Sequence, residues 1–196
     1  QVRAEMQGSI DAAKKESAEY LELYTKENKT RKAIHNKLLE LQGNIRVICR
    51  VRPMLEVERK SGEDSDVTGF PSDEDITIQK DVVTRQRFEY DRVFQPLSVQ
   101  VEVFNQVQPV CVSVLDGYNV CIFAYGQTGS GKTYTMEGGT DSVSKGVSPR
   151  AVDEVFRLIN DMENDWEYTV SFSMLEIYNE TIRDLLISPE KARSKD

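Results

Sequence analysis

The strongest constraint on the fold is a glycine-rich stretch near the middle of the chain, which reads IFAYGQTGSGKTYTM at Ile122–Met136. Within it, Gly126, Gly131, Lys132 and Thr133 match the pattern G-x-x-x-x-G-K-S/T of a phosphate-binding loop. Glycines let successive backbone N–H groups turn inward, where a side chain would obstruct an anion. The lysine can then reach the β- and γ-phosphates of a nucleotide, and the threonine hydroxyl can bind the Mg²⁺ ion.

The segments on either side are those that such a loop requires. Asn119–Tyr125 is apolar and aromatic, which predicts a short strand buried on both faces. Lys132–Met136 can begin a helix whose amino terminus faces the phosphates. The alternative, a glycine-rich turn without a ligand, is disfavoured because strand, loop and helix occur in this order.

Composition indicates one sizeable core with an extended appendage in a chain of 196 residues. No apolar run approaches the ~20 residues of a membrane span, and the charged amino terminus does not resemble a secretory signal. The widely spaced Cys49, Cys111 and Cys121 indicate a reducing compartment and no zinc site. Residues 44–196 hold seventeen Lys/Arg against twenty-six Asp/Glu, an acidic balance that argues against a nucleic-acid partner.

Residues 1–43 predict a separate helical region. They are polar, contain no proline, and place apolar or small residues at eight of the twelve a and d positions of a heptad between residues 3 and 41: Met6, Ile10, Ala13, Tyr20, Tyr24, Ile34, Leu38 and Leu41. The exceptions, Arg3, Ser17, Glu27 and Arg31, make this stripe weak in its middle. We expect a long helix that pairs with a second copy, most securely over Ile34–Leu41. The alternative is a single helix lying on its own domain. His35, at an e position, is expected to be a surface residue.

The remainder, residues 44–196, predicts an α/β domain. Gly43 and Asn44 are typical of a helix end, and strands are expected at Ile45–Arg52, Ile76–Gln79 and Arg87–Phe94. The acidic residues 56–75 predict a solvated loop.

Apolar residues recur at helical spacing from Ser98 to Asp116, which predicts a helix that Pro109 interrupts. A second helix is expected to begin at Pro149. Trp166–Tyr178 predicts a long strand and Asn179–Leu186 a short helix or turn. This order is that of a phosphate-loop NTPase, a mixed sheet flanked by helices.

Three segments together resemble the kinesin motor domain. They are RVRP at Arg50–Pro53, FAYGQTGSGKTYTM at Phe123–Met136 and LEIYNE at Leu175–Glu180, and the resemblance extends over residues 44–186. The helix that runs directly into the first strand resembles the neck of kinesins whose motor is carboxy-terminal. The resemblance implies a dimeric, ATP-dependent, minus-end-directed motor of the microtubule cytoskeleton in the cytoplasm.

The resemblance also implies roles for individual residues. The phosphates of ATP or ADP would be held by Gly126, Gln127, Thr128, Gly129, Ser130, Gly131, Lys132 and Thr133. Lys132 would stabilise phosphate charge in catalysis, and Thr133 would contact the Mg²⁺ bound to the nucleotide. The adenine base would lie in a base cradle formed by Arg50, Arg52, Pro53 and Tyr134, against the proline and tyrosine rings.

The sequence departs from the kinesin pattern in one respect. The two switch motifs, S-S-R-S-H and D-L-A-G-S-E, do not occur in it, nor do the later basic elements that bind microtubules. We therefore expect the neck and about the first half of a motor, with a bare sheet edge and uncovered apolar faces. This chain alone is expected to bind nucleotide weakly at best, to hydrolyse it negligibly and not to hold microtubules.

Two other functions remain open. The chain could act through residues 1–42 as a dimerising, dominant-negative coiled-coil module without ATPase activity. It could also be a different nucleotide-binding protein, such as a GTPase, although no guanine-reading N-K-x-D motif is present.

Overall fold

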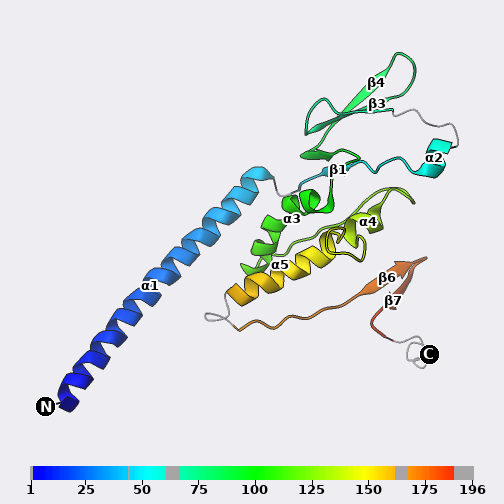
Figure 1. Ribbon diagram of the computed structural model, residues 1–196. Coiled ribbons are helices and arrows are strands. Elements are labelled where there is room, and N and C mark those ends of the chain that lie inside the picture. The colour runs from blue at the N-terminus through cyan, green and yellow to red at the C-terminus, as the bar shows by residue number, and fades with distance from the viewer. Residues whose placement is uncertain (1, 44, 61–66, 162–166, 188–196) are drawn as a thin grey trace. The chain divides into compact units, whose positions relative to one another are not determined.

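The structure, a computed structural model, describes residues 2–43, 45–60, 67–161 and 167–187 (Figure 1). The chain divides into two compact units, residues 1–157 and residues 158–196, and each is described by itself. The first unit combines helices with short strands, two of which pair in parallel, and this confirms the predicted α/β class. Within the described residues, no helix combines the length and the apolar character that crossing a membrane requires.

The predicted amino-terminal helix is confirmed as α1, Val2–Gln42. It ends where the sequence indicated, since the Gly43 N–H donates to the Glu40 carbonyl at 3.1 Å. Residues 6–27 are all exposed, whereas a set of residues in the last third of the helix is half-buried: Asn28, Lys32, His35, Asn36 and Leu39. These positions lie on one helical face, so the carboxyl-terminal part of α1 contacts another element.

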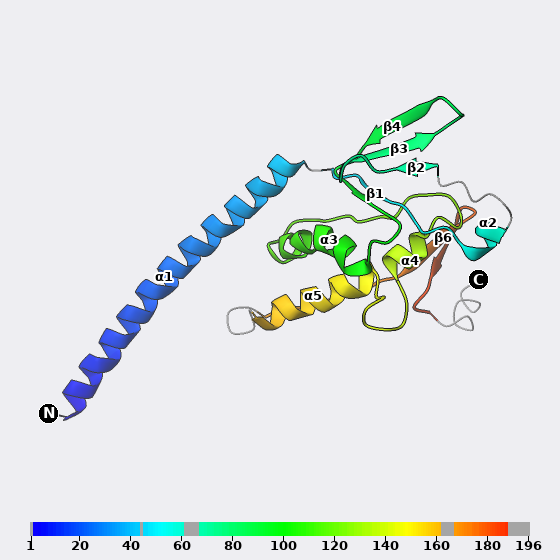
Figure 2. The same cartoon turned by 45° about the horizontal axis from the view of Figure 1, so that its top comes forward.

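Two small sheets form the β-structure of the first unit. β1, Ile48–Arg50, pairs in parallel with β5, Arg92–Phe94. β2 (Thr68–Gly69), β3 (Asp75–Gln79) and β4 (Arg85–Glu89) form an antiparallel sheet in that order (Figure 2).

The prediction of one continuous strand over Arg87–Phe94 is wrong, because the chain changes partners between β4 and β5. The Tyr90 N–H still donates to Glu74 next to β3, whereas the Asp91 N–H donates to Val47 next to β1. The Asp91 carboxylate in turn accepts from the Val47 N–H at 2.6 Å. The change of partner therefore begins between two consecutive residues, although the Val93 N–H of β5 still donates to the Asp73 carbonyl at 2.6 Å.

Four further helices complete the helical content of the described residues: α2 (Glu56–Lys60), α3 (Gln100–Leu115), α4 (Lys132–Met136) and α5 (Val147–Asp161). α2 and β2 lie within the predicted acidic loop, of which residues 61–66 are outside the described residues. α3 runs through Pro109, and the Glu102 carboxylate accepts from the Val99 N–H at its start. The buried apolar residues come mainly from α3 and β5: Ile76, Val93, Phe94, Val103, Phe104, Val107, Cys111 and Val147.

The predicted strand at Asn119–Tyr125 is not formed. This segment is irregular, and most of its side chains, including Phe123 and Tyr125, are exposed. A strand needs hydrogen bonds to a neighbour, and within the described residues β1 and β5 pair with each other and not with this segment. The expectation of uncovered apolar surface is therefore confirmed here.

In the second unit, the strand expected over Trp166–Tyr178 is confirmed only at β6, Leu175–Tyr178; Trp166 lies outside the described residues. The expected helix or turn at Asn179–Leu186 is a two-residue turn, Asn179 and Glu180, followed by β7, Thr181–Asp184. β6 and β7 form an antiparallel hairpin whose residues are all exposed.

Candidate functional site

Three glycines of the loop between Tyr125 and α4 have positive φ angles: Gly126, Gly129 and Gly131. Gly131 caps the amino terminus of α4 with φ +97°, in the left-handed region. A Cβ atom added at Gly126 would lie 2.6 Å from Ser130 Oγ, too close for a real contact. The loop therefore closes tightly on itself immediately before a helix begins, as the sequence predicted.

Lys132 reaches back across this loop. Its Nζ donates to the carbonyls of Gly126 and Gln127, each at 2.8 Å. Thr133 lies exposed in the first turn of α4, and its hydroxyl makes no hydrogen bond to another described residue. The first N–H groups of a helix have no partner within it, so α4 presents donors at the loop. A cationic side chain, helix N–H groups and an accessible hydroxyl fit the phosphates and Mg²⁺ of a nucleotide.

Arg50, in β1, extends from the sheet toward α4. Its guanidinium donates to Gln100 Oε1 at 2.8 Å, to Thr135 Oγ1 at 3.1 Å and to the Ser98 carbonyl at 3.5 Å. The guanidinium carbon lies 5.3 Å from the centre of the Tyr134 ring, a distance typical of a cation–π contact. Burial lowers the pKa of Arg50, although an arginine remains charged.

Arg52 is held by α2. Its guanidinium forms a two-pronged contact with the Glu58 carboxylate, which also accepts from the Leu55 N–H at 2.8 Å. These hydrogen bonds, first that from Arg52, lower the pKa of Glu58 to about 2. A Cβ atom added at Gly131 would lie 3.9 Å from Arg52 Cβ, so this residue adjoins the loop.

The structure thus brings residues of two predicted segments, 50–53 and 126–134, together to different degrees. Arg50 contacts Tyr134, and Arg52 lies beside the loop. Pro53 is exposed, and its carbonyl accepts from Arg52 at 3.2 Å. Gln127 and Thr128 are exposed at the loop, whose turn is closed by the Ser130 N–H donating to the Gln127 carbonyl.

Sequence reasoning missed the residues that hold this arrangement, above all Gln100. This residue is buried at the start of α3 and bonds to both Arg50 and α4. A signal was present: Gln100 precedes Val103, Phe104 and Val107 at helical spacing, so a polar residue stands on an apolar stripe. Glu58 and Thr135 carried no comparable signal.

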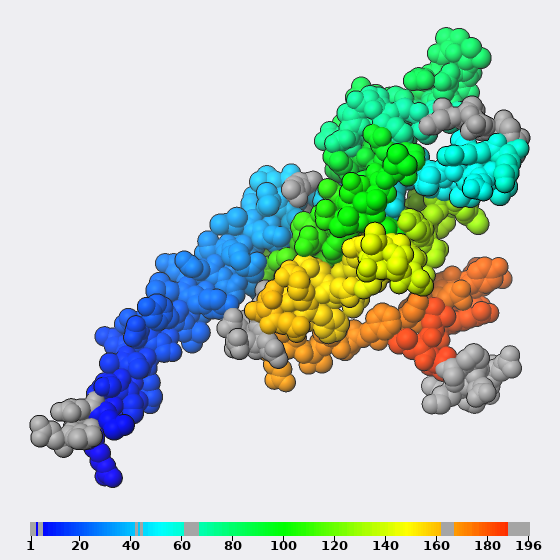
Figure 3. Space-filling model, viewed as in Figure 1, coloured from blue at the N-terminus to red at the C-terminus, as the bar shows by residue number. Residues whose placement is uncertain are grey.

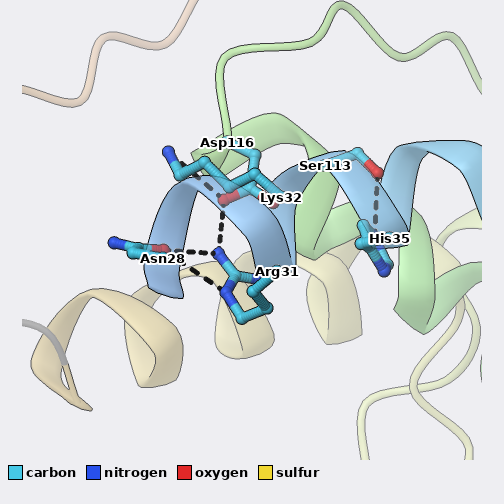
Figure 4. Close-up of polar contacts among 6 residues, drawn as sticks. All are labelled: Asn28, Arg31, Lys32, His35, Ser113 and Asp116. Atoms are coloured by element: carbon cyan, nitrogen blue, oxygen red, sulfur yellow. Dashed lines mark hydrogen bonds and ion pairs between the residues drawn. The ribbon is translucent and has the colours of Figure 1, made fainter. Parts of the chain in front are cut away.

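A second group of polar residues joins α1 to the end of α3, and we refer to Arg31, Lys32, His35, Ser113 and Asp116 as the clasp (Figure 4). Arg31 donates to Asp116 Oδ1 at 2.8 Å, and Lys32 Nζ lies 3.4 Å from the same atom. His35 Nε2 lies 3.3 Å from Ser113 Oγ. The space-filling view shows the two helices in contact (Figure 3).

The clasp changes two expectations. His35 is half-buried, so the prediction that it is a surface residue is only partly right. The half-buried face of α1 occupies the b, e and f positions of the heptad and not its a/d stripe. The stripe stays exposed where pairing is most expected, since Ile34, Leu38 and Leu41 have exposed fractions of 65%, 52% and 76%.

Comparisons with known proteins agree with this geometry. The family described as "Microtubule binding" matches residues 24–186. Protein claret segregational of Drosophila melanogaster is 46% identical over 173 residues, covering 84% of this chain and 24% of the relative. Kinesin-like protein KIFC1 of Rattus norvegicus is 46% identical over 182 residues, covering 80% of this chain and 26% of the relative.

Further matches extend to plants and to a solved structure. Kinesin-like protein KIN-14R of Oryza sativa subsp. japonica is 46% identical, covering 85% of this chain and 16% of the relative. A solved structure described as that of a fast kinesin superposes with a TM-score of 0.69 at 40% identity, covering 72% of this chain and 40% of the other. The chain therefore spans about a quarter or less of the length of these curated relatives.

The fold and the loop define the chain as part of a phosphate-loop motor domain, and the chain belongs to the kinesin family. The relatives are, more narrowly, kinesin-14 proteins, whose motor is carboxy-terminal, as the order of α1 and β1 predicted.

Proposed function

We propose that this chain is the neck helix, residues 1–43, and the nucleotide-binding first part, residues 44–196, of a minus-end-directed microtubule motor. Gly126–Thr133 binds the phosphates of ATP or ADP, with Thr133 on Mg²⁺, and the base cradle binds the adenine. The observation that carries this proposal is the loop itself: Gly131 opens α4 in the left-handed region while Lys132 spans the loop. ATP would supply the phosphoryl group, and Mg²⁺ would neutralise part of the phosphate charge.

Lys132 and the Arg50–Tyr134 pair contribute to different parts of this binding. Lys132 exchanges its two carbonyl contacts for phosphate oxygens, which are stronger acceptors because they are charged. Arg50 is held against Tyr134 and offers a flat, cationic surface beside the loop. The chain lacks the switch motifs, so binding without appreciable hydrolysis is the activity we assign to it alone.

Calorimetric titration of the 196-residue chain with MgADP tests the binding. We expect Lys132→Ala to weaken binding by more than tenfold, since it removes the cation that faces the phosphates. Lys145→Ala is the matched control, because Lys145 pairs with Asp153 on α5 and should not affect affinity. Wild-type protein that binds no nucleotide, or Lys132→Ala that binds as tightly, contradicts the proposal.

A steady-state ATPase assay with and without polymerised tubulin tests the second part. The chain alone should show negligible turnover in both cases. Turnover that rises with microtubules would refute the assignment of this chain as an incomplete motor.

A second function, dimerisation through α1, is favoured by one specific observation. Ile34, Leu38 and Leu41 of the a/d stripe are exposed, although neighbouring residues of the same turns, among them His35, contact α3. Arg31, also at an a position, contacts Asp116 at the end of α3. We propose that two copies pair through this stripe as a coiled coil, which is also how the chain would act as a dominant-negative module. Sedimentation of residues 1–196 against residues 44–196 tests it, and a monomeric full chain at micromolar concentration refutes it.

A further inference from the structure

The side chain of Gln100 connects three segments around the candidate site. Its Oε1 accepts from the Arg50 guanidinium at 2.8 Å, and its Nε2 donates to the Tyr134 carbonyl at 2.7 Å and to the Ser144 carbonyl at 3.2 Å. The residue is only 3% exposed. A buried amide with all of these partners holds β1, α4 and the segment after α4 at fixed distances from the start of α3.

The partners determine the orientation of the amide. An arginine can only donate hydrogen bonds, and a carbonyl can only accept them, so the oxygen must face Arg50 and the nitrogen must face Tyr134 and Ser144. A glutamate would lack the donors, and a lysine would lack the acceptor. A glutamine supplies both the acceptor and the donors that this position uses, and packing alone does not explain why a polar residue is placed on the apolar face of α3.

The two site residues that Gln100 holds are Arg50 and Tyr134, the pair whose cation–π contact forms one side of the base cradle. Gln100 fixes the guanidinium directly and fixes the backbone from which the tyrosine ring projects. The glycines and Lys132 of the phosphate loop make no hydrogen bond to Gln100. The base side and the phosphate side of the site are thus supported by different contacts.

We propose that Gln100 is a positioning residue for base recognition, which holds Arg50 and Tyr134 at the spacing that a bound adenine requires. This inference rests on the proposed nucleotide-binding function. Gln100 then contributes to the affinity for the adenine base and not to the affinity for the phosphates.

Two ligands separate these contributions in the 196-residue chain: MgADP, and magnesium pyrophosphate, which offers a diphosphate without the base and its ribose. Gln100→Met has a similar length but no hydrogen bonds to offer. We expect it to weaken MgADP binding by about tenfold, equivalent to about 1.4 kcal/mol, and to leave pyrophosphate binding within about twofold of wild type. A merely structural role for Gln100 would weaken both ligands equally.

Gln108→Met is the matched control, since Gln108 lies on the same helix, is exposed, and bonds to Glu154 at 3.0 Å. It should bind both ligands as wild type does. Gln100→Glu is the second variant: it keeps the acceptor for Arg50 and loses the donors, so it should also reduce MgADP binding selectively. Circular dichroism reports whether each variant is folded.

The outcomes are distinct. Wild-type protein that binds neither ligand overturns the proposed function, and this inference with it. Wild-type binding with a parallel loss of both ligands, or with no loss, in the Gln100 variants overturns this inference alone. Unfolding of both Gln100 variants also overturns this inference alone, because Gln100 would then be required for folding and not for positioning the residues that bind the base.

Discussion

The clasp predicts an asymmetry between removing a buried anion and removing the cations that pair with it. The Asp116 side chain is 2% exposed and its Oδ2 atom is buried without a hydrogen bond, whereas Arg31 and Lys32 remain partly exposed. In Asp116→Asn the cations can turn to water, and the negative charge at the carboxyl end of α3, unfavourable to the helix dipole, is removed. The cost should be about 1 kcal/mol of the free energy that docks α1 on α3.

Replacing both cations has the larger effect. Arg31→Gln with Lys32→Gln leaves a carboxylate buried without a compensating charge, and we expect a loss of about 2 kcal/mol, below the usual range for a fully buried pair because the clasp is open on one side. Adding Asp116→Asn to that variant should recover about 1 kcal/mol, since the uncompensated charge disappears.

Hydrogen exchange of the α1 amides at residues 28–39 measures this docking. Lys37→Gln is the control: Lys37 is exposed and pairs only within α1, with Glu40, among the described residues. The predicted asymmetry does not hold if the two-cation variant is no less protected than Asp116→Asn, or if the triple variant is no better protected than the two-cation variant.

Three further predictions concern the loop, α2 and the stripe. Gly131→Ala should cost about 1–2 kcal/mol in chemical denaturation and abolish MgADP binding, because alanine is strained at φ +97°; unchanged binding would contradict the loop geometry. The pKa of Glu58 is depressed to about 2, so the stability from its Arg52 contact is present above its ordinary pKa of 4.5 and is lost as the pH falls toward 2. The acid-dependent drop in the denaturation midpoint should be smaller in Glu58→Gln than in wild type, the remainder coming from other carboxylates such as Glu154, and an equal drop would contradict this contact. Leu38→Lys should shift sedimentation to the monomer while protection at residues 28–39 persists; a dimer that survives would exclude the stripe as its interface.

The sequence predicted best where the pattern is local. α1 and α3 follow from apolar spacing, and the glycines of the loop follow from the backbone that a tight turn before α4 requires. The strand predicted at Asn119–Tyr125 is not formed. An apolar run indicates that a segment can be buried, but it does not indicate whether a neighbouring strand is present to pair with it. β7 was missed for a different reason: Asn179–Leu186 was expected to be a short helix or turn, whereas only Asn179 and Glu180 turn and the chain continues as a strand.

The candidate site shows the same division. Gly126–Thr133 is a contiguous motif, so the loop and the start of α4 could be placed from sequence. The contact of Lys132 with the loop carbonyls was not predicted. The contacts that hold Arg50 and Arg52 come from Gln100 and Glu58, on separate helices, and no spacing in the sequence joins these pairs. Long-range polar pairing depends on the final packing of the elements, which is why sequence patterns did not reveal it.

The a/d stripe of α1 and the face that contacts α3 point in different directions. The number of residues in the helix therefore determines how the amino-terminal part of the stripe is oriented relative to α3. One extra residue inserted between Glu27 and Asn28 would turn every upstream position by about 100° relative to α3, while the clasp and the stripe at Ile34–Leu41 kept their places. The stripe from Met6 to Tyr24 would then point away from its continuation, and a partner helix could follow only one of the two halves. Seven inserted residues would restore the alignment, so the chain tolerates lengthening of its neck in whole heptads and not in single residues.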